Sequence, residues 1–263
     1  MTSFNAILDY AKKMALEAGE IQLKLFRSQE LEIATKQNDF DVVTAADKAS
    51  EKIIIESINK YFPDHSILTE ESGLSFRGNG DWEWVIDPLD GTTNYSAGLP
   101  WFNVSIGIKH KGETVVGVVY APRLDEMFTA VKGQGATLNG KAIYPSETPT
   151  LTKAVVSTGF PYDKAVNPDN NLDNFMRIMP VVRGLRRMGS AALDICYVAA
   201  GFFDAYWEMN LNEWDVCAAM LIAHEAGAYA ERFRPDRNWS ILASNKALQP
   251  QLSELLSCEP AAY

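Results

Sequence analysis

The chain has 263 residues, of which 47% are hydrophobic, and a formal net charge of −10 at pH 7. This hydrophobic content can fill a substantial core, which excludes a disordered protein. The acidic balance argues against a general binder of nucleic acid or of anionic membranes, because such proteins need clustered Lys and Arg. An anionic small molecule would approach so acidic a protein only where bound cations attract it.

Apolar residues spaced three and four apart predict a first helix from Phe4 to Leu25, and a second helix is expected over residues 45–61. Short strands that end at Glu70 and Asp87 follow. A β-rich meander over residues 102–143 comes next, with turns at Gly112 and at Asn139-Gly140.

The second half of the chain begins with a strand over residues 154–158. Helix and strand patterns then alternate through residues 188–200, 203–208 and 212–226. The stretch 162–174 is rich in Asp, Asn and Pro, which predicts a surface loop. The order of elements predicts a layered α/β (α+β) sandwich with an N-terminal half over 1–145 and a C-terminal half over 146–263.

The segment Trp84-Val-Ile-Asp87-Pro-Leu-Asp90-Gly-Thr92-Thr93-Asn94 joins a strand to two carboxylates and a hydroxyl pair. Two carboxylates about 4 Å apart repel by roughly 4 kcal/mol at an effective dielectric of 20, so a turn that brings them together favours a bound cation. Carboxylate, hydroxyl and carbonyl ligands suit Mg²⁺ or Mn²⁺. Gly91 allows close approach of the backbone, and Thr92 can open a helix whose free N–H groups face phosphate. The alternative is that Asp-Pro and Asp-Gly are ordinary turn dipeptides.

Two more acidic segments extend the pattern. Glu70-Glu71 ends a short apolar strand, the position at which open α/β sheets place ligands, although such a pair can also be solvated surface. Asp215 follows Asn212 by three residues at the start of the helix 216–226. Asn212 and Asp215 also have the spacing of a helix capping pair, so Asp215 could have a purely structural role.

These segments occur in one chain and in this order, and together the sequence resembles the inositol monophosphatases, of the Mg²⁺-dependent, lithium-sensitive phosphatase superfamily. The resemblance rests on five segments and covers nearly the whole chain: Asp87-Pro-Leu-Asp90-Gly-Thr92-Thr93-Asn94-Tyr95, Glu208-Met-Asn-Leu-Asn-Glu-Trp214-Asp215-Val-Cys-Ala-Ala, Thr69-Glu70-Glu71-Ser72, Arg187-Met-Gly189-Ser190-Ala191-Ala192-Leu-Asp and Ala223-His-Glu-Ala-Gly227. It implies an αβαβα sandwich of the sugar-phosphatase type.

The resemblance also implies a site. Two or three Mg²⁺ ions, with Mn²⁺ as a possible substitute, would be held by the side chains or carbonyls of Glu70, Asp87, Leu89, Asp90 and Asp215. Glu70 and Thr92 would position a metal-bound water for in-line attack on phosphorus. Asp47 would bind Thr92 as part of the proton path, although Thr44 and Asp47 also have capping-box spacing, which allows a purely structural role.

The same resemblance implies a substrate-binding set, in which Gly91 and Thr92 hold phosphate and the others face the alcohol: Asp90, Gly91, Thr92, Gly189, Ser190, Ala191, Glu208 and Asp215. Arg183, Arg186 and Arg187 form a basic cluster just before this segment. They could contact phosphate, brace an acidic loop, cross the interface of the homodimer that the family typically forms, or stay solvated.

The expected activity is hydrolysis of a phosphate monoester, first of all inositol 1-phosphate. Histidinol phosphate, a sugar phosphate or 3'-phosphoadenosine 5'-phosphate are alternatives, but Thr92-Thr93-Asn94 is more similar to the inositol branch than to the nucleotide branch. A third possibility is a regulatory protein-binding role, as some bacterial relatives have in transcription complexes. The chain contains no Gly-x-Ser-x-Gly, Walker A or Cys-x5-Arg motif, which agrees with a mechanism that needs no nucleophilic side chain.

The cysteines and histidines add no competing site. Cys196, Cys217 and Cys258 lie far apart and are expected to be buried thiols, and the three histidines have no metal-ligand spacing. No apolar run approaches the roughly 18 residues of a membrane span, and no apolar leader precedes the first helix. We therefore expect a cytoplasmic protein.

Overall fold

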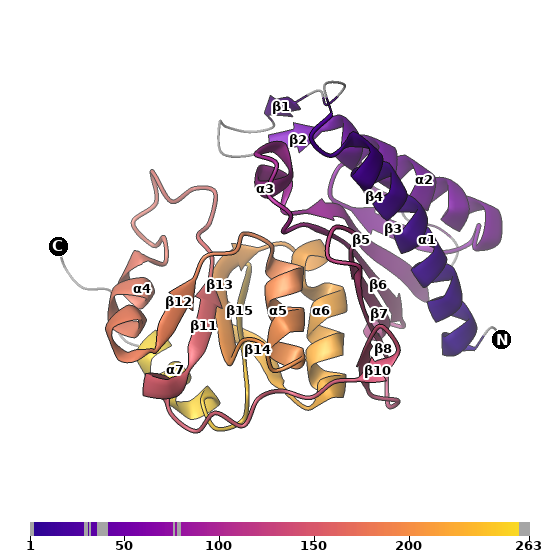
Figure 1. Ribbon diagram of the computed structural model, residues 1–263. Helices are drawn as coiled ribbons and strands as arrows, with labels where there is room; N and C mark the ends of the chain where they lie inside the picture. The colour runs from indigo at the N-terminus through magenta and orange to yellow at the C-terminus, as the bar shows by residue number, and fades with distance from the viewer. Residues whose placement is uncertain are drawn as a thin grey trace.

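The computed structural model describes residues 3–28, 31, 33–35, 42–75, 77 and 80–257. In this part of the chain, helices alternate with two β-sheets in the order helices, sheet, helices, sheet, helices (Figure 1). One hydrophobic cluster lies between the outer helices and the first sheet, a second surrounds the central helices and reaches both sheets, and a third lies between the second sheet and the last helices. The predicted αβαβα sandwich is confirmed.

The outer helical layer consists of α1 (Phe4–Leu25) and α2 (Ala45–Tyr61), which have the bounds expected from the sequence. Ser3 caps α1 by accepting a hydrogen bond from the Ala6 amide. The predicted apolar face of α1 is buried against the first sheet. A two-stranded antiparallel ribbon, β1 (Ile33–Thr35) and β2 (Val42–Thr44), precedes α2.

The first sheet has the strand order β10-β9-β8-β7-β6-β5-β3-β4. Its members are β3 (Ser66–Thr69), β4 (Gly73–Ser75), β5 (Trp82–Asp90), β6 (Asn103–His110), β7 (Glu113–Ala121), β8 (Glu126–Val131), β9 (Ala136–Leu138) and β10 (Lys141–Ala142). Strands β6 to β10 form the predicted antiparallel meander. Gly112 has φ 83°, and Asn139 and Gly140 have φ 49° and 77°, so both predicted turns use the left-handed backbone region.

The central helical layer consists of α5 (Ala191–Ala199) and α6 (Glu213–Ala226), which pack against both sheets. The second sheet has the order β12-β11-β13-β15-β14. Its members are β11 (Val155–Thr158), β12 (Gly184–Arg186), β13 (Ala205–Leu211), β14 (Tyr229–Arg234) and β15 (Trp239–Ser244). The last layer holds α4 (Leu172–Ile178) and α7 (Gln249–Leu256), and the remaining short helices are α3 (Thr92–Ser96), η1 (Leu151–Lys153) and η2 (Met179–Val181).

The expectation of a surface loop over residues 162–174 is wrong at its C-terminal end. Residues 172–174 belong to α4, and Asn171 and Asn174 are buried. The Asn171 amide donates to the Gly159 carbonyl at 2.6 Å, and its oxygen accepts from the Trp207 indole at 2.9 Å. An Asn-rich segment is therefore buried here because its amides satisfy polar groups of the second sheet.

The predicted division after residue 145 falls in the connection between β10 and η1, and it stays a prediction. Cys196 and Cys217 are buried free thiols, as expected, whereas Cys258 lies outside the described residues. None of the helices in the described ranges combines the length and the apolar character that a membrane span requires.

Candidate active site

Parallel pairing of β3 and β5 places the first two acids side by side. The register matches Thr69 with Ile86, so Glu70, which directly follows β3, lies beside Asp87 in the C-terminal part of β5. Burial is the largest cause of the raised pKa of Asp87, and the Glu70 carboxylate is close enough to raise it further. This end of the strands is where open α/β sheets bind ligands.

A bulge in β5 brings Asp87 and Asp90 to the same face of the sheet. Side chains three residues apart on a regular strand point to opposite faces. Here Asp87 pairs with Ser105 and Asp90 with Asn103, so one extra residue on β5 restores the same orientation. Pro88 lies inside the bulge, where proline is tolerated, and its carbonyl accepts from the buried Gln22 amide at 2.8 Å.

The turn after β5 requires glycine and begins α3 as predicted. Gly91 has φ 92°, and a Cβ at this position would lie 2.8 Å from the Trp101 carbonyl oxygen. Thr92 follows as the first residue of α3, and its hydroxyl lies 2.9 Å from Asp47 Oδ1 and 3.0 Å from the Leu89 carbonyl oxygen. Both oxygens can accept only, so the hydroxyl donates toward them and can itself accept from a group in the pocket.

Asp47 makes both contacts that its sequence position allowed. It forms a capping box with Thr44 at the start of α2, in which its Oδ2 accepts from the Thr44 amide at 2.8 Å. Its other oxygen accepts from Thr92. Burial raises the pKa of Asp47 more than these hydrogen bonds lower it.

Asp90 is fixed by the segment that opens α5. Its Oδ2 accepts from the Ser190 hydroxyl at 2.7 Å, from the Ala192 amide at 2.9 Å and from the Asn103 amide at 3.2 Å. Ser190 is also the N-cap of α5. The Ser190 hydroxyl is thus buried within the protein, whereas Gly189 and Ala191 line the pocket.

Asp215 and Glu208 complete the arrangement from the second half of the chain. Asp215 forms the predicted capping pair at the start of α6, where its Oδ2 accepts from the Asn212 amide at 2.6 Å. Glu208 on β13 accepts from the Tyr206 hydroxyl at 2.6 Å. Burial raises the pKa of Glu208 to about 7, although the hydrogen bond from Tyr206 and the charge of Arg187 lower it.

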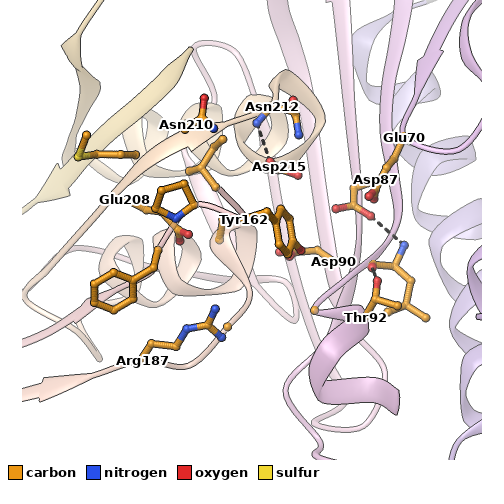
Figure 2. A pocket seen from close by; sticks show the side chains of 18 residues that line it. Glu70, Asp87, Asp90, Thr92, Tyr162, Arg187, Glu208, Asn210, Asn212 and Asp215 are labelled. Atoms are coloured by element: carbon orange, nitrogen blue, oxygen red, sulfur yellow. Dashed lines mark hydrogen bonds between the residues drawn. The ribbon is translucent and has the colours of Figure 1, made fainter. Parts of the chain in front are cut away.

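One pocket brings together most of the predicted residues (Figure 2). Glu70, Asp87 and Thr92 line it from the side of the first sheet, and Glu208 and Asp215 line it from β13 and α6. The other predicted residues that line it are Leu89, Asp90, Gly91, Gly189 and Ala191. Asp47 and Ser190 stand behind this lining and bind Thr92 and Asp90.

The structure adds residues to the site that sequence reasoning missed. Phe160, Tyr162 and Met209 line the pocket, and Arg187 is the member of the basic cluster that does so. The Asn94 amide donates to the Met188 carbonyl at 2.8 Å and so connects α3 to the segment before α5. Asn94 and Met209 lie in segments that carry the family resemblance, whereas Phe160 and Tyr162 lie outside all of them and had no signal of their own.

The acids of the pocket raise one another's pKa. Burial is the largest cause for Asp87, and Glu70, Asp90 and Asp215 add to it by repulsion. The pKa values of Asp215 and Asp90 are also raised by burial, and for Asp90 the hydrogen bond from Ser190 opposes the effect. In the metal-free protein, deprotonating these groups together at neutral pH is costly.

The donor set fits hard divalent cations. Buried carboxylates and the Leu89 carbonyl are the ligands that Mg²⁺ and Mn²⁺ prefer, and Arg187 is the basic residue among those lining the pocket. Within the described ranges, no three Asp, Glu, His or Cys side chains are already arranged as a metal-binding group. Repulsion between carboxylates opposes such convergence until a cation binds. The set Glu70, Asp87, Leu89, Asp90 and Asp215 therefore remains a predicted metal site.

Comparison with solved structures first defines the class of protein. An inositol monophosphatase from Anabaena (Nostoc) sp. PCC 7120 superimposes with a TM-score of 0.87 and 40% sequence identity, and 98% of each chain is covered. The fold is thus that of the layered α/β phosphatases to which that enzyme belongs.

The sequence comparisons then identify the family. The model of the inositol monophosphatase family matches residues 5–261, so the chain belongs to this family, a family of phosphatases. A Nus factor SuhB of Pasteurella multocida is 45% identical over 223 residues, which are 85% of this chain and 84% of the relative. The Nus factor SuhB of Escherichia coli K12 is 39% identical over 246 residues, which are 94% of this chain and 92% of that protein.

Proposed function

We propose that this chain is a Mg²⁺-dependent phosphate monoester hydrolase that acts on inositol 1-phosphate. The observation that carries the proposal is the gathering of Glu70, Asp87, Asp90 and Asp215 around one pocket, where each added carboxylate makes a bound cation more favourable. Family membership and the similarity to an inositol monophosphatase support the substrate class.

In this proposal the acids and the Leu89 carbonyl hold the metal ions. Bound Mg²⁺ would supply positive charge at the entering and leaving oxygens and would lower the pKa of water. The residues of the chain then orient the reactants. Thr92 donates to Asp47 or Leu89, so a lone pair of its hydroxyl can accept from the attacking water, while the Glu70 carboxylate accepts from the other side.

Gly91 and Thr92 would hold the phosphate at the turn that begins α3. Asp90 keeps a fixed position there because Ser190, Ala192 and Asn103 donate to it. Glu208 would accept hydrogen bonds from hydroxyls of the alcohol, with Gly189 and Ala191 lining the wall between. Asp47 and Ser190 act through Thr92 and Asp90.

A substrate panel tests the proposal. Phosphate release is measured from inositol 1-phosphate, histidinol phosphate, a sugar phosphate and 3'-phosphoadenosine 5'-phosphate, each with Mg²⁺ and with a chelator. We expect release only with Mg²⁺, and a kcat/KM for inositol 1-phosphate at least about 10-fold above the others. A higher kcat/KM for another ester would replace the inositol assignment, and no release from any ester would contradict the phosphatase itself.

A second candidate function is favoured by the names of the relatives. Proteins 45% and 39% identical are named Nus factor SuhB, so a regulatory protein-binding role for this chain is the alternative. Affinity capture from cell extract with the Glu70→Gln variant separates the two functions, because a regulatory partner would still be captured by a variant without turnover. Sedimentation of the purified protein tests the expected homodimer, and fractionation of cells tests the expected cytoplasmic location.

A further inference from the structure

Glu51 is a buried carboxylate that lies outside the lining of the active-site pocket. It is on α2, 5% exposed, and one helical turn after Asp47. Residues four apart project from the same face of a helix, so Glu51 and Asp47 point to the same side of α2. No sequence motif drew attention to Glu51, because a single Glu in an amphipathic helix is usually solvated.

Both carboxylate oxygens of Glu51 bind the turn that carries Glu70. Oε2 accepts from the Thr69 hydroxyl at 2.8 Å and from the Glu71 amide at 3.0 Å. Oε1 accepts from the Ser72 hydroxyl. The donors therefore come from the residue before Glu70 and from the two residues after it, and they bracket Glu70 in the chain.

These contacts fix a segment that has little packing of its own. The turn joins β3 to β4, a strand of three residues at the edge of the first sheet, where Leu74 is 60% exposed. Hydrogen bonds to a carboxylate are about twice as strong as neutral ones, and here they tie the turn to a long, well-packed helix. The direction of the Glu70 side chain thus depends on a residue far earlier in the sequence.

We propose that Glu51 is a positioning residue, which holds Glu70 in the orientation needed for metal binding. The inference rests on the proposed function, and it assigns a second task to α2. Asp47 binds Thr92 after β5, and Glu51 binds the turn after β3, so one helix holds both loops that form the first-sheet side of the pocket.

Metal affinity of the otherwise intact protein tests this role. Metal-free wild type, Glu51→Ala and Glu51→Gln are titrated with Mn²⁺ by calorimetry, with Glu56→Ala as the matched control. Glu56 is on the same helix but exposed, where it pairs with Lys52 at 3.9 Å. We expect Glu51→Ala to weaken Mn²⁺ binding at least about 10-fold, the usual effect of removing a group that orients a ligand, and Glu56→Ala to leave it unchanged.

The conservative variant Glu51→Gln separates positioning from simple loss of charge. Its side-chain amide oxygen can still accept from Thr69 and Glu71, while its NH₂ group donates to Ser72, so we expect Mn²⁺ binding within about 3-fold of wild type. If Glu51→Ala does not fold, Thr69→Val removes one donor and keeps the side-chain shape, and it should still weaken Mn²⁺ binding measurably.

Hydrogen exchange provides a readout without any metal. The Glu71 amide should exchange faster in metal-free Glu51→Ala than in wild type, because its acceptor is gone. Wild-type Mn²⁺ affinity in folded Glu51→Ala or in Thr69→Val, or unchanged exchange at Glu71, would overturn the role of Glu51. Wild-type protein that binds no Mn²⁺ would instead refute the proposed metal site itself, so the two failures are distinguishable.

Discussion

The variant Asp87→Asn should stabilise the metal-free protein and at the same time remove its response to Mg²⁺. Asp87 is 2% exposed, and its pKa is raised well above 3.8 by burial and by the charges of Glu70, Asp90 and Asp215. Asparagine has the same shape, and its oxygen can still accept from the Leu89 amide, which donates to Asp87 Oδ1 at 2.9 Å. The substitution thus removes a charge without creating a cavity.

Proton linkage predicts that Asp87→Asn raises, rather than lowers, the stability of the metal-free protein. Because the pKa of Asp87 is higher in the folded state, the folded protein binds more protons than the unfolded one, and stability falls as the pH rises above 3.8 toward the folded pKa. A second carboxylate about 4 Å from an ionised Asp87 would repel it by roughly 4 kcal/mol at an effective dielectric of 20. Partial protonation of the acidic cluster removes part of this repulsion. We therefore expect Asp87→Asn to gain on the order of 2 kcal/mol at pH 7.5 without metal, or about 4–8 °C in Tm.

Thermal melting with and without Mg²⁺ measures both effects. Wild type should gain about 3 kcal/mol at an Mg²⁺ concentration 100-fold above its Kd, whereas Asp87→Asn should gain little. The order of the two melting temperatures should therefore reverse when Mg²⁺ is added. A variant that melts below wild type in the absence of metal at pH 7.5, or that gains as much from Mg²⁺, would refute the reasoning.

Three further predictions concern activity. Glu70→Gln should lower kcat at least about 100-fold, equivalent to 2.7 kcal/mol of barrier, whereas Glu71→Gln, one residue away and outside the pocket lining, should stay close to wild type in the same phosphate-release assay. A Cβ at Gly159 would overlap the Glu208 carboxylate and displace it. Gly159→Ala should therefore raise KM for inositol 1-phosphate at least about 5-fold without changing the Mg²⁺ dependence of the reaction. An unchanged KM would argue against substrate contact at Glu208. The pH profile of kcat/KM should show an inflection near 7 from Glu208, which is absent in Glu208→Gln, while the substrate's own ionisation near pH 6 persists in both.

The regular elements could be predicted from the sequence because their signals are local. The helices at Phe4–Leu25 and Ala45–Tyr61 and the turn at Asn139-Gly140 follow from apolar spacing, caps and turn residues that lie within a few positions of one another. The segment around Asn171 was misread because its burial depends on Trp207 and Gly159, which reach it only through the tertiary fold.

The motifs predicted the residues of the candidate site and the contact between Asp47 and Thr92, but not the contacts made by residues outside the motifs. Asp87 and Asp90 stand in a recognisable string, but the bulge that turns them to one face depends on pairing with the neighbouring strand. Glu51 binds the turn that carries Glu70, and Asn103 binds Asp90. Neither Glu51 nor Asn103 lies in a motif. Local sequence therefore predicts which groups would carry the proposed chemistry, and the three-dimensional structure shows what holds them in place.

The most direct measurement of the central claim is an anomalous difference map from a crystal of this protein soaked with Mn²⁺. The account predicts strong peaks between Glu70, Asp87, Asp90 and Asp215, with the Leu89 carbonyl as a further ligand, and loss of at least one peak in the Asp87→Asn variant. A map without density among these four carboxylates, at a concentration that supports phosphate release, would contradict it.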